Sequence, residues 1–210
     1  MSKEVCIIDY GAGNIQSVFN AVSHLGYNPK VTSNYAEILN SKRLILPGVG
    51  SFKKAMESIV SLKIDSSVIE VLQDQSVKIL GICLGMQLLA LNSTEDGYSI
   101  GFGLIPAIVE KFSVENIKGQ KIPHIGFNQV NCEADSLLLN GIERKSDFYF
   151  VHSYRMTVPA NQPGVFLTCD YGEDFLAGYE HKNVFATQFH PEKSQVNGLK
   201  LIENFLKVKV

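Results

Sequence analysis

The chain has 210 residues and a mass of 23.2 kDa, enough for one substantial α/β domain spanning residues 1–210. Its 19 basic and 21 acidic residues give a net charge of −2 without any Lys/Arg run that could follow a phosphate backbone, so nucleic acid is not an expected partner. The N-terminal apolar run is too short for a signal peptide or a membrane span, which makes the cytoplasm the expected location and excludes a membrane partner.

Strands and helices alternate in the first half of the chain. Short β-branched or aliphatic runs at residues 5–8, 43–46 and 78–82 predict three buried strands, expected side by side. Apolar residues at helical spacing predict a helix that Gly26 ends, and a second helix over residues 84–91. This alternation is typical of βαβ units, so we expect an α/β fold with a central, mostly parallel sheet flanked by helices.

The pattern changes after about Gly97 to short strands separated by turns. Strands are predicted at residues 104–109, 148–151, 165–168, 175–179 and 184–188, and they indicate a smaller antiparallel portion. A closing helix is expected over residues 195–206, with Leu199, Ile202 and Phe205 on one face.

The four cysteines, Cys6, Cys83, Cys132 and Cys169, lie far apart with no CxxC pair. This spacing predicts neither a disulfide framework nor a zinc site, and no metal is expected. One cysteine stands between two glycines where a strand meets a helix, in the run Gly81-Ile82-Cys83-Leu84-Gly85.

This run has the layout of a nucleophile elbow with cysteine in the serine position. The glycines allow close backbone approach, and the start of a helix favours a thiolate at Cys83. The amide of Leu84 is then free to donate to a developing oxyanion. The alternative is that Cys83 is one more small buried residue and that the glycines mark packing.

A histidine and a glutamate follow the last predicted strand. Side chains at i and i+2 of an extended segment share a face, so Glu192 can orient the imidazole of His190. The other ring nitrogen would take a proton from Cys83 and return it to a departing amine. A lone histidine beside a proline is more often a turn residue, but both motifs are expected at the carboxyl edge of one sheet, as a thiol acyl-transfer site requires.

The loop Leu46-Pro47-Gly48-Val49-Gly50 follows the second strand and should lie at the same edge. Its glycines allow the peptide at Val49 to turn an amide inward, as a second oxyanion donor, although an ordinary loop leading to a helix has the same composition.

The run Asp9-Tyr10-Gly11-Ala12-Gly13-Asn14 resembles a dinucleotide fingerprint only at first sight, because Gln16 stands where the third glycine is needed. No cofactor is therefore expected. A turn into the first helix, with a partner-facing role, is the better interpretation.

Six motifs taken together resemble a known family. They occupy residues 9–14, 46–50, 81–87, 123–128, 151–154 and 188–194. In this order, and over nearly the whole chain, they resemble HisH, the glutaminase subunits of imidazole glycerol phosphate synthase within the class I, triad-type glutamine amidotransferases. The resemblance implies a flavodoxin-like fold and hydrolysis of L-glutamine to glutamate and ammonia.

The resemblance also implies a role for each matching residue. Cys83 is implied as the nucleophile, His190 as the general acid and base, and Glu192 as its orienter. The oxyanion amides would come from Leu84 and Val49, the latter after a peptide flip triggered by a partner. The residues implied to hold glutamine are Gly50, Gln87, Glu95, Ser153 and Tyr154, with Glu95 facing the α-amino group.

The implied partner is a (β/α)8-barrel cyclase subunit, which would form a heterodimer with this chain and receive its ammonia for histidine biosynthesis. The family usually has Met and Trp where this chain has Ile125 and Phe127, at a place implied to face the partner. This departure leaves open an alternative destination, in which a paralogous glutaminase and a cyclase-like partner supply ammonia for amidination of a bacterial surface sugar.

Two other function classes explain less of the sequence. A cysteine peptidase shares the elbow but gives no role to Gln87 and Glu95. A catalytically degenerate binding subunit conflicts with the presence of Cys83, His190 and Glu192 together.

Overall fold

The structure is a computed structural model that describes residues 3–11 and 13–209, so Ala12 of the N-terminal turn lies outside the described residues. The helices are α1 (Ile15–His24), α2 (Tyr35–Leu39), α3 (Phe52–Ser61), α4 (Ile64–Val71), α5 (Leu84–Leu88) and α6 (Gln195–Lys207), with a 3-10 turn η1 (Pro191–Lys193). The strands are β1 (Glu4–Ile8), β2 (Asn28–Thr32), β3 (Arg43–Leu46), β4 (Lys78–Ile82), β5 (Ala90–Ser93), β6 (Ser99–Ile100), β7 (Ile105–Lys111), β8 (His124–Cys132), β9 (Ser146–His152), β10 (Tyr154–Met156), β11 (Val165–Asp170), β12 (Asp174–His181) and β13 (Val184–Thr187).

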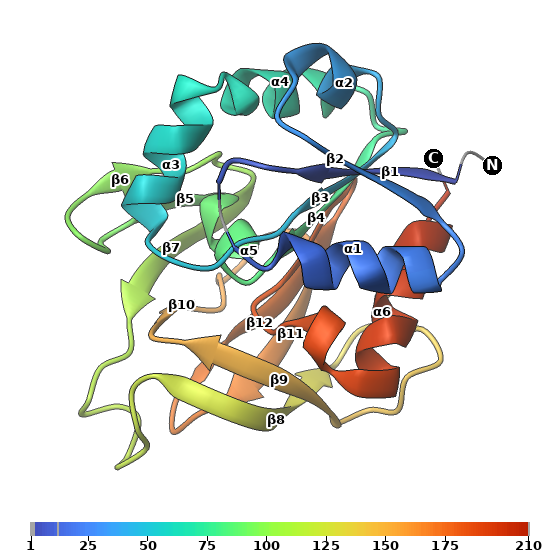
Figure 1. The fold of residues 1–210 in the computed structure, drawn as a ribbon. Coiled ribbons are helices and arrows are strands. Elements are labelled where there is room, and N and C mark those ends of the chain that lie inside the picture. Colours follow the sequence, from blue (N-terminus) through green and yellow to red (C-terminus); the bar gives the residue numbers. More distant parts are fainter. Residues whose placement is uncertain (1–2, 12, 210) are drawn as a thin grey trace.

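A nine-stranded sheet in the order β2-β1-β3-β4-β13-β12-β11-β8-β9 runs through the molecule (Figure 1). The pairings from β2 to β13 are parallel and those from β13 to β9 antiparallel. A second sheet has the order β10-β7-β5-β6. The predicted α/β fold is confirmed, and β1, β3 and β4 are neighbours as expected. Because β13 is the parallel neighbour of β4, the segments that follow β3, β4 and β13 leave the sheet at one edge.

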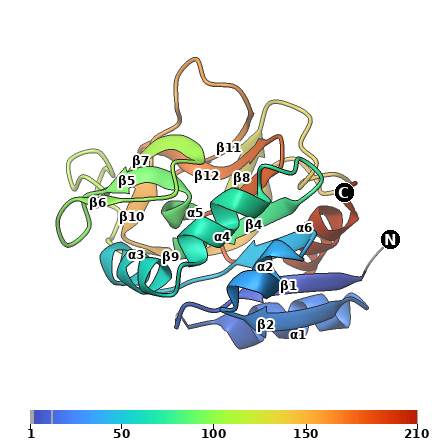
Figure 2. The ribbon, with the colours of Figure 1, turned by 90° about the horizontal axis from the view of Figure 1, so that it is seen from above.

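Both faces of the central parallel strands β1, β3, β4 and β13 are buried, which explains why these strands are apolar without a polar face, whereas the edge strand β2 is polar and mostly exposed. Along β1, Cys6 and Ile8 pack into one core cluster while Val5 and Ile7 pack into the other. Figures 1 and 2 show α1 and α6 on one side of this sheet and α2, α3 and α4 on the other.

The predicted helix over residues 84–91 is wrong in its second half. The helix α5 ends at Leu88, and Ala90 begins β5. The backbone amide of Gly101 donates to the Leu91 carbonyl oxygen, and that of Gly103 donates to the Ala90 carbonyl oxygen. Pairing with this later segment therefore determines the conformation of residues 89–91. A continuous apolar run indicates burial but does not distinguish a helix from a buried strand. The strands β2 and β8 are absent from the prediction because polar residues interrupt both.

None of the helices in the described part of the chain combines the length and apolar character needed to cross a bilayer.

We predict that Gly85→Ala lowers the free energy of unfolding by about 3 kcal/mol or more, because an added Cβ would lie 1.7 Å from the Leu46 carbonyl oxygen. Urea titration measures the loss. The matched control is Gly26→Ala, where φ is +77° and nothing lies within 4 Å of the new Cβ, with an expected cost of about 1 kcal/mol. Equal losses in the two variants would contradict a close approach of α5 to β3.

Candidate active site

The expected elbow is present between β4 and α5. Cys83 has φ 53° and ψ −109°, a strained conformation for a residue with a Cβ, and its side chain is buried. Its amide donates to the Thr187 carbonyl oxygen at 2.7 Å, which fixes the turn to the end of β13. A Cβ on Gly81 would meet the Gly85 backbone at 2.8 Å, so the two glycines allow the sharp turn that presents Cys83.

The Leu84 amide, expected to be free, is instead occupied. It donates to the Gly48 carbonyl oxygen at 3.3 Å, in the loop between β3 and α3. The N–H and C=O groups of a trans peptide point in opposite directions, so the Val49 amide points away from Leu84. The two expected oxyanion donors therefore lie together, but the structure shows them in an arrangement that cannot bind an oxyanion.

His190 and Glu192 follow β13 as expected and form a fully buried pair. The imidazole Nδ1 lies 2.7 Å from Glu192 Oε1, and both side chains are 0 % exposed. Burial disfavours the imidazolium, but the Cys83 thiolate and the Glu192 carboxylate outweigh it and raise the pKa of His190. The His190 Nε2 is also buried, and no atom in the described part of the chain forms a hydrogen bond with it, which leaves this nitrogen available to exchange a proton.

Asn14 also contacts this pair, which the sequence did not predict. Its amide nitrogen donates to Glu192 Oε1 and lies 3.4 Å from His190 Nδ1. Asn14 occupies the N-cap of α1 with φ 73°, yet its side chain makes no capping hydrogen bond. Asparagine at a helix start normally caps the helix, so Asn14 is a residue whose side chain serves the His190–Glu192 pair instead.

A cavity of about 300 Å³ opens above Cys83 and contains every residue that the resemblance implies for substrate binding. The residues that line it are Val49, Gly50, Cys83, Leu84, Gln87, Glu95, Val151, His152, Ser153 and Tyr154. Its volume lies near the lower end of the range of roughly 300–1,000 Å³ for small-molecule sites. Two larger cavities within the described residues, one beside Cys132 and one beside Asp147, have no histidine in their lining.

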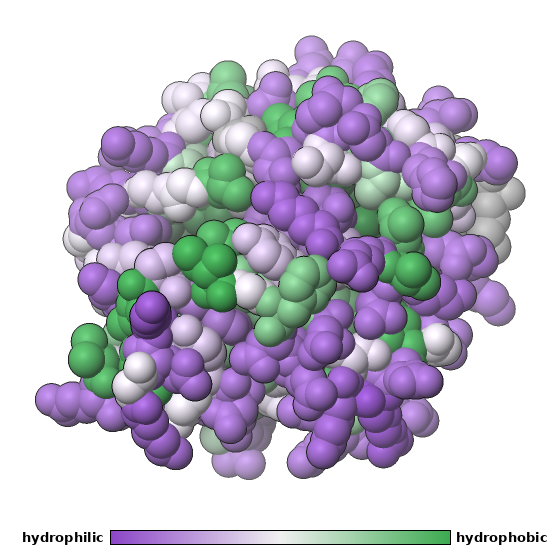
Figure 3. Space-filling model, turned by 60° about the horizontal axis from the view of Figure 1, so that its bottom comes forward, coloured by the Kyte–Doolittle hydropathy of each residue, from purple (hydrophilic) through white to green (hydrophobic). Residues whose placement is uncertain are grey.

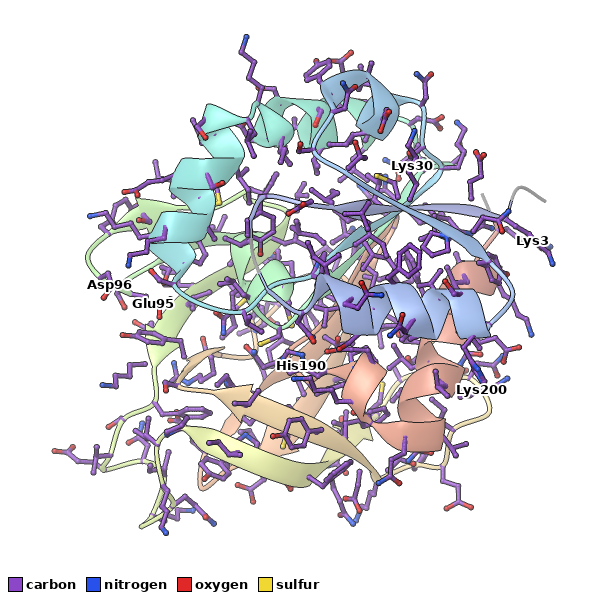
Figure 4. All side chains as sticks on the ribbon, in the orientation of Figure 1. Lys3, Lys30, Glu95, Asp96, His190 and Lys200 are labelled. Atoms are coloured by element: carbon purple, nitrogen blue, oxygen red, sulfur yellow. The ribbon has the colours of Figure 1, made fainter. Side chains whose placement is uncertain are left out.

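Glu95 reaches this cavity from the loop after β5, and Figure 4 shows it below α3. Its carboxylate accepts a hydrogen bond of 2.7 Å from the Phe52 amide, at the start of α3. Burial raises the pKa of Glu95, and the Phe52 amide opposes this shift. The charged form gains stability from any cation that enters the cavity.

Two further histidines lie at and behind the cavity wall, His152 in its lining and His124 behind it. The His152 Nδ1 donates to the Tyr154 carbonyl oxygen at 2.8 Å, so its Nε2 accepts from the His124 Nδ1 at 3.1 Å. Burial lowers the pKa of His124 to about 4 and that of His152 to about 3, so both are neutral at pH 7.

In the described part of the chain, no group of three or more His, Cys, Asp or Glu side chains is placed to hold a metal ion.

We predict that the free energy of unfolding falls as the pH drops from 6 to 5. The unfolded chain binds protons at both histidines with a pKa near 6.5, whereas the folded chain does so only near pH 4 and pH 3. Each histidine contributes a slope of about 1 kcal/mol per pH unit. Urea titrations of His152→Gln should show a smaller slope than those of the parent. A slope that His152→Gln leaves unchanged would contradict a neutral His152.

We also predict that Asn14→Gly slows alkylation of Cys83 by iodoacetamide at pH 7 about tenfold, because Glu192 loses a donor and orients His190 less firmly. Glycine keeps the positive φ of this position. The control is Asn34→Gly at the N-cap of α2, where the side chain accepts from the Glu37 amide. That variant should lose stability without slower alkylation, and equal rates in the two variants would remove Asn14 from the site.

Comparison with solved structures agrees with this architecture. A structure described as a glutamine amidotransferase matches with a TM-score of 0.75 at 18% identity and covers 97% of each chain. The structure of PurLQS from Thermotoga maritima matches with a TM-score of 0.70 at 20% identity, covering 98% of this chain and 98% of that one. At these identities the likeness establishes the fold alone.

Sequence comparison establishes the family. The family model for "Glutamine amidotransferase class-I" matches residues 6–208. Imidazole glycerol phosphate synthase subunit HisH 1 of Parasynechococcus marenigrum is 41% identical over 98% of each chain, and that of Methanococcus maripaludis 44% identical over 97% of this chain and 99% of its own. With this degree of identity over nearly its full length, the chain belongs to the class I glutamine amidotransferase family, in its branch of HisH subunits.

Proposed function

We propose that the chain is a glutaminase that hydrolyses the side-chain amide of L-glutamine to glutamate and ammonia. The observation that carries this proposal is the buried His190–Glu192 pair beside Cys83, at a cavity lined also by Gln87 and Glu95. The Cys83 thiolate attacks the amide carbon, and His190 gives a proton to the departing nitrogen, which leaves as ammonia. The same imidazole then takes a proton from water, which attacks the thioester and releases glutamate and the Cys83 sulfur.

Different residues of the cavity contact different parts of a glutamine molecule in this proposal. Glu95 provides a carboxylate for the α-ammonium group, and a bound cation offsets the cost of its burial. Gly50, Gln87, Ser153 and Tyr154 complete the walls and hold the remainder of the substrate.

The oxyanion site is in a resting state in this proposal. A half-turn of the peptide between Gly48 and Val49 would withdraw the Gly48 carbonyl from Leu84 and bring the Val49 amide to the same side. Two donors would then face the developing oxyanion. Gly50, with φ +118°, provides backbone freedom beside this peptide.

Two hydrogen bonds limit the movement to this short stretch. The Tyr10 hydroxyl donates to the Pro47 carbonyl oxygen at 2.8 Å, and Glu95 holds the Phe52 amide on the other side. The loop is therefore held at both ends, with the peptide between Gly48 and Val49 inside the held stretch. A partner that touches this loop can switch the oxyanion donors without moving Cys83.

We propose that this partner is a cyclase subunit with a (β/α)8-barrel fold, and that the pair forms a heterodimeric imidazole glycerol phosphate synthase for histidine biosynthesis. The names of the relatives support this assignment. The chain matches 34% of the length of the Arabidopsis thaliana relative named imidazole glycerol phosphate synthase hisHF, at 41% identity. Ammonia is protonated in neutral water, so direct transfer between subunits would preserve the nucleophile.

The strand β8 offers a surface for such a partner. Ile125 is 59 % exposed and Phe127 is 50 % exposed, with the Phe127 ring against Tyr149 of β9. Figure 3 brings this side of the molecule forward and shows hydrophobic residues exposed among hydrophilic ones. The alternative destination suggested by Phe127, amidination of a surface sugar, finds no support among these relatives.

We predict that Cys83→Ala lowers glutamine-dependent turnover of the complex by about 10³-fold or more while ammonia-dependent turnover stays within twofold. The reason is that only the glutamine reaction uses the thiolate. Steady-state rates with glutamine or ammonium chloride measure both, and the analogue 6-diazo-5-oxo-norleucine should label Cys83 in the parent. Loss of both activities would oppose the assignment.

We further predict that adding the cyclase subunit raises kcat for glutamine hydrolysis about 10²-fold with little change in KM, the effect of gaining one oxyanion donor. Initial rates with and without the partner test this. Full activity of the isolated chain would contradict a resting oxyanion site.

A further inference from the structure

The carboxamide of Gln188 contacts two residues that line the substrate cavity, Cys83 and Gln87. Gln188 follows β13, two residues before His190, and it is 0 % exposed. Its Oε1 accepts from the Gln87 Nε2 at 2.9 Å, and its Nε2 donates to the Cys83 Sγ at 3.7 Å. A buried amide is thus in contact with the sulfur that reacts.

The hydrogen-bond network fixes which end of this amide faces the sulfur. The Tyr154 carbonyl oxygen can only accept, so the Gln87 nitrogen that lies 3.0 Å from it is a true donor. That nitrogen also faces Gln188, which must therefore present its oxygen to Gln87. The remaining end of Gln188, its NH₂ group, faces Cys83.

The sulfur has different partners in its two protonation states. The thiol donates to the Val151 carbonyl oxygen, 4.0 Å away, whereas a thiolate has no proton to give and gains nothing from that oxygen. The Gln188 N–H is a partner for the thiolate, because hydrogen bonds to charged acceptors are stronger than those to neutral ones. Gln188 therefore favours the charged sulfur over the neutral one.

We propose that Gln188 is a further catalytic residue, which donates a hydrogen bond to the Cys83 thiolate and is held in that orientation by Gln87 and the Tyr154 carbonyl. The proposal rests on the glutaminase function, since it names a second group besides His190 that prepares the nucleophile. Gln87 lines the substrate cavity, so substrate binding and the reactive sulfur share one network. When the thioester is hydrolysed, the same N–H donates a hydrogen bond to the thiolate that is released.

The test is the rate of Cys83 alkylation by iodoacetamide between pH 5 and pH 10, followed by mass spectrometry of the Cys83 peptide to separate it from the other three cysteines. In Gln188→Leu, the midpoint of the rate against pH should rise by about one pH unit, so alkylation at a pH below the midpoint of the parent is about tenfold slower. At high pH the rate should equal or exceed that of the parent, because a thiolate without a donor is more nucleophilic. Gln188→Glu should move the midpoint further, since a carboxylate repels the thiolate.

The matched control is Asn183→Leu, which removes a buried amide at the other end of β13, where it donates to the Leu72 carbonyl oxygen at 3.0 Å. It should lose stability and keep the midpoint. If Gln188→Leu does not fold, Gln87→Leu is the second variant, and it should raise the midpoint by less because Gln188 only loses its orienting partner.

An unmoved midpoint in a folded Gln188 variant, or an equal shift in Asn183→Leu, would overturn the proposal. This assay uses neither glutamine nor the partner subunit. A failed glutaminase assignment would therefore appear in the turnover of Cys83→Ala and leave the alkylation result intact. An unmoved midpoint in the Gln188 variants, with the expected turnover of Cys83→Ala, would rule out only the role proposed for Gln188.

Discussion

The site depends on the close packing of the start of α5 against the end of β3. At Gly85 the backbone comes so near the Leu46 carbonyl that no side chain fits, and this contact holds Cys83 in its strained conformation. The hydrogen bond from the Cys83 amide to Thr187 then ties the same turn to β13. The ends of three central strands thus meet at one residue, and Cys83, the His190–Glu192 pair and the loop after β3 take their positions from that meeting.

The sequence predicted the parts of the molecule whose signals are local. The strands at β3 and β4 and the elbow at Cys83 follow from apolar runs, a strand-to-helix junction and paired glycines. The His190–Glu192 contact follows from i, i+2 spacing at a strand end. The second half of the predicted helix over residues 84–91 failed because pairing with residues 101–105 decides its conformation, and apolar composition carries no information about that partner.

The parts of the site that the sequence did not predict are polar side chains whose partners lie far away in the sequence. Asn14 is 178 residues from Glu192 and Gln188 is 105 residues from Cys83, so no spacing rule connects them. The occupied Leu84 amide was missed for a related reason, since the orientation of the peptide at Gly48 is a choice between two conformations that the same glycines permit. Residue types indicated where donors would lie, and only the folded structure shows where they point.

The short length of α5 has a consequence for recognition of the substrate. A helix advances about 1.5 Å per residue, so continuing from Leu88 to Glu95 would carry that carboxylate roughly 10 Å along the helix axis. The chain instead leaves the helix and enters β5, and Glu95, in the turn that follows this strand, lines the cavity beside Cys83. Because α5 stops at Leu88, the Glu95 carboxylate and the Cys83 sulfur line one cavity, where a single small molecule could contact both.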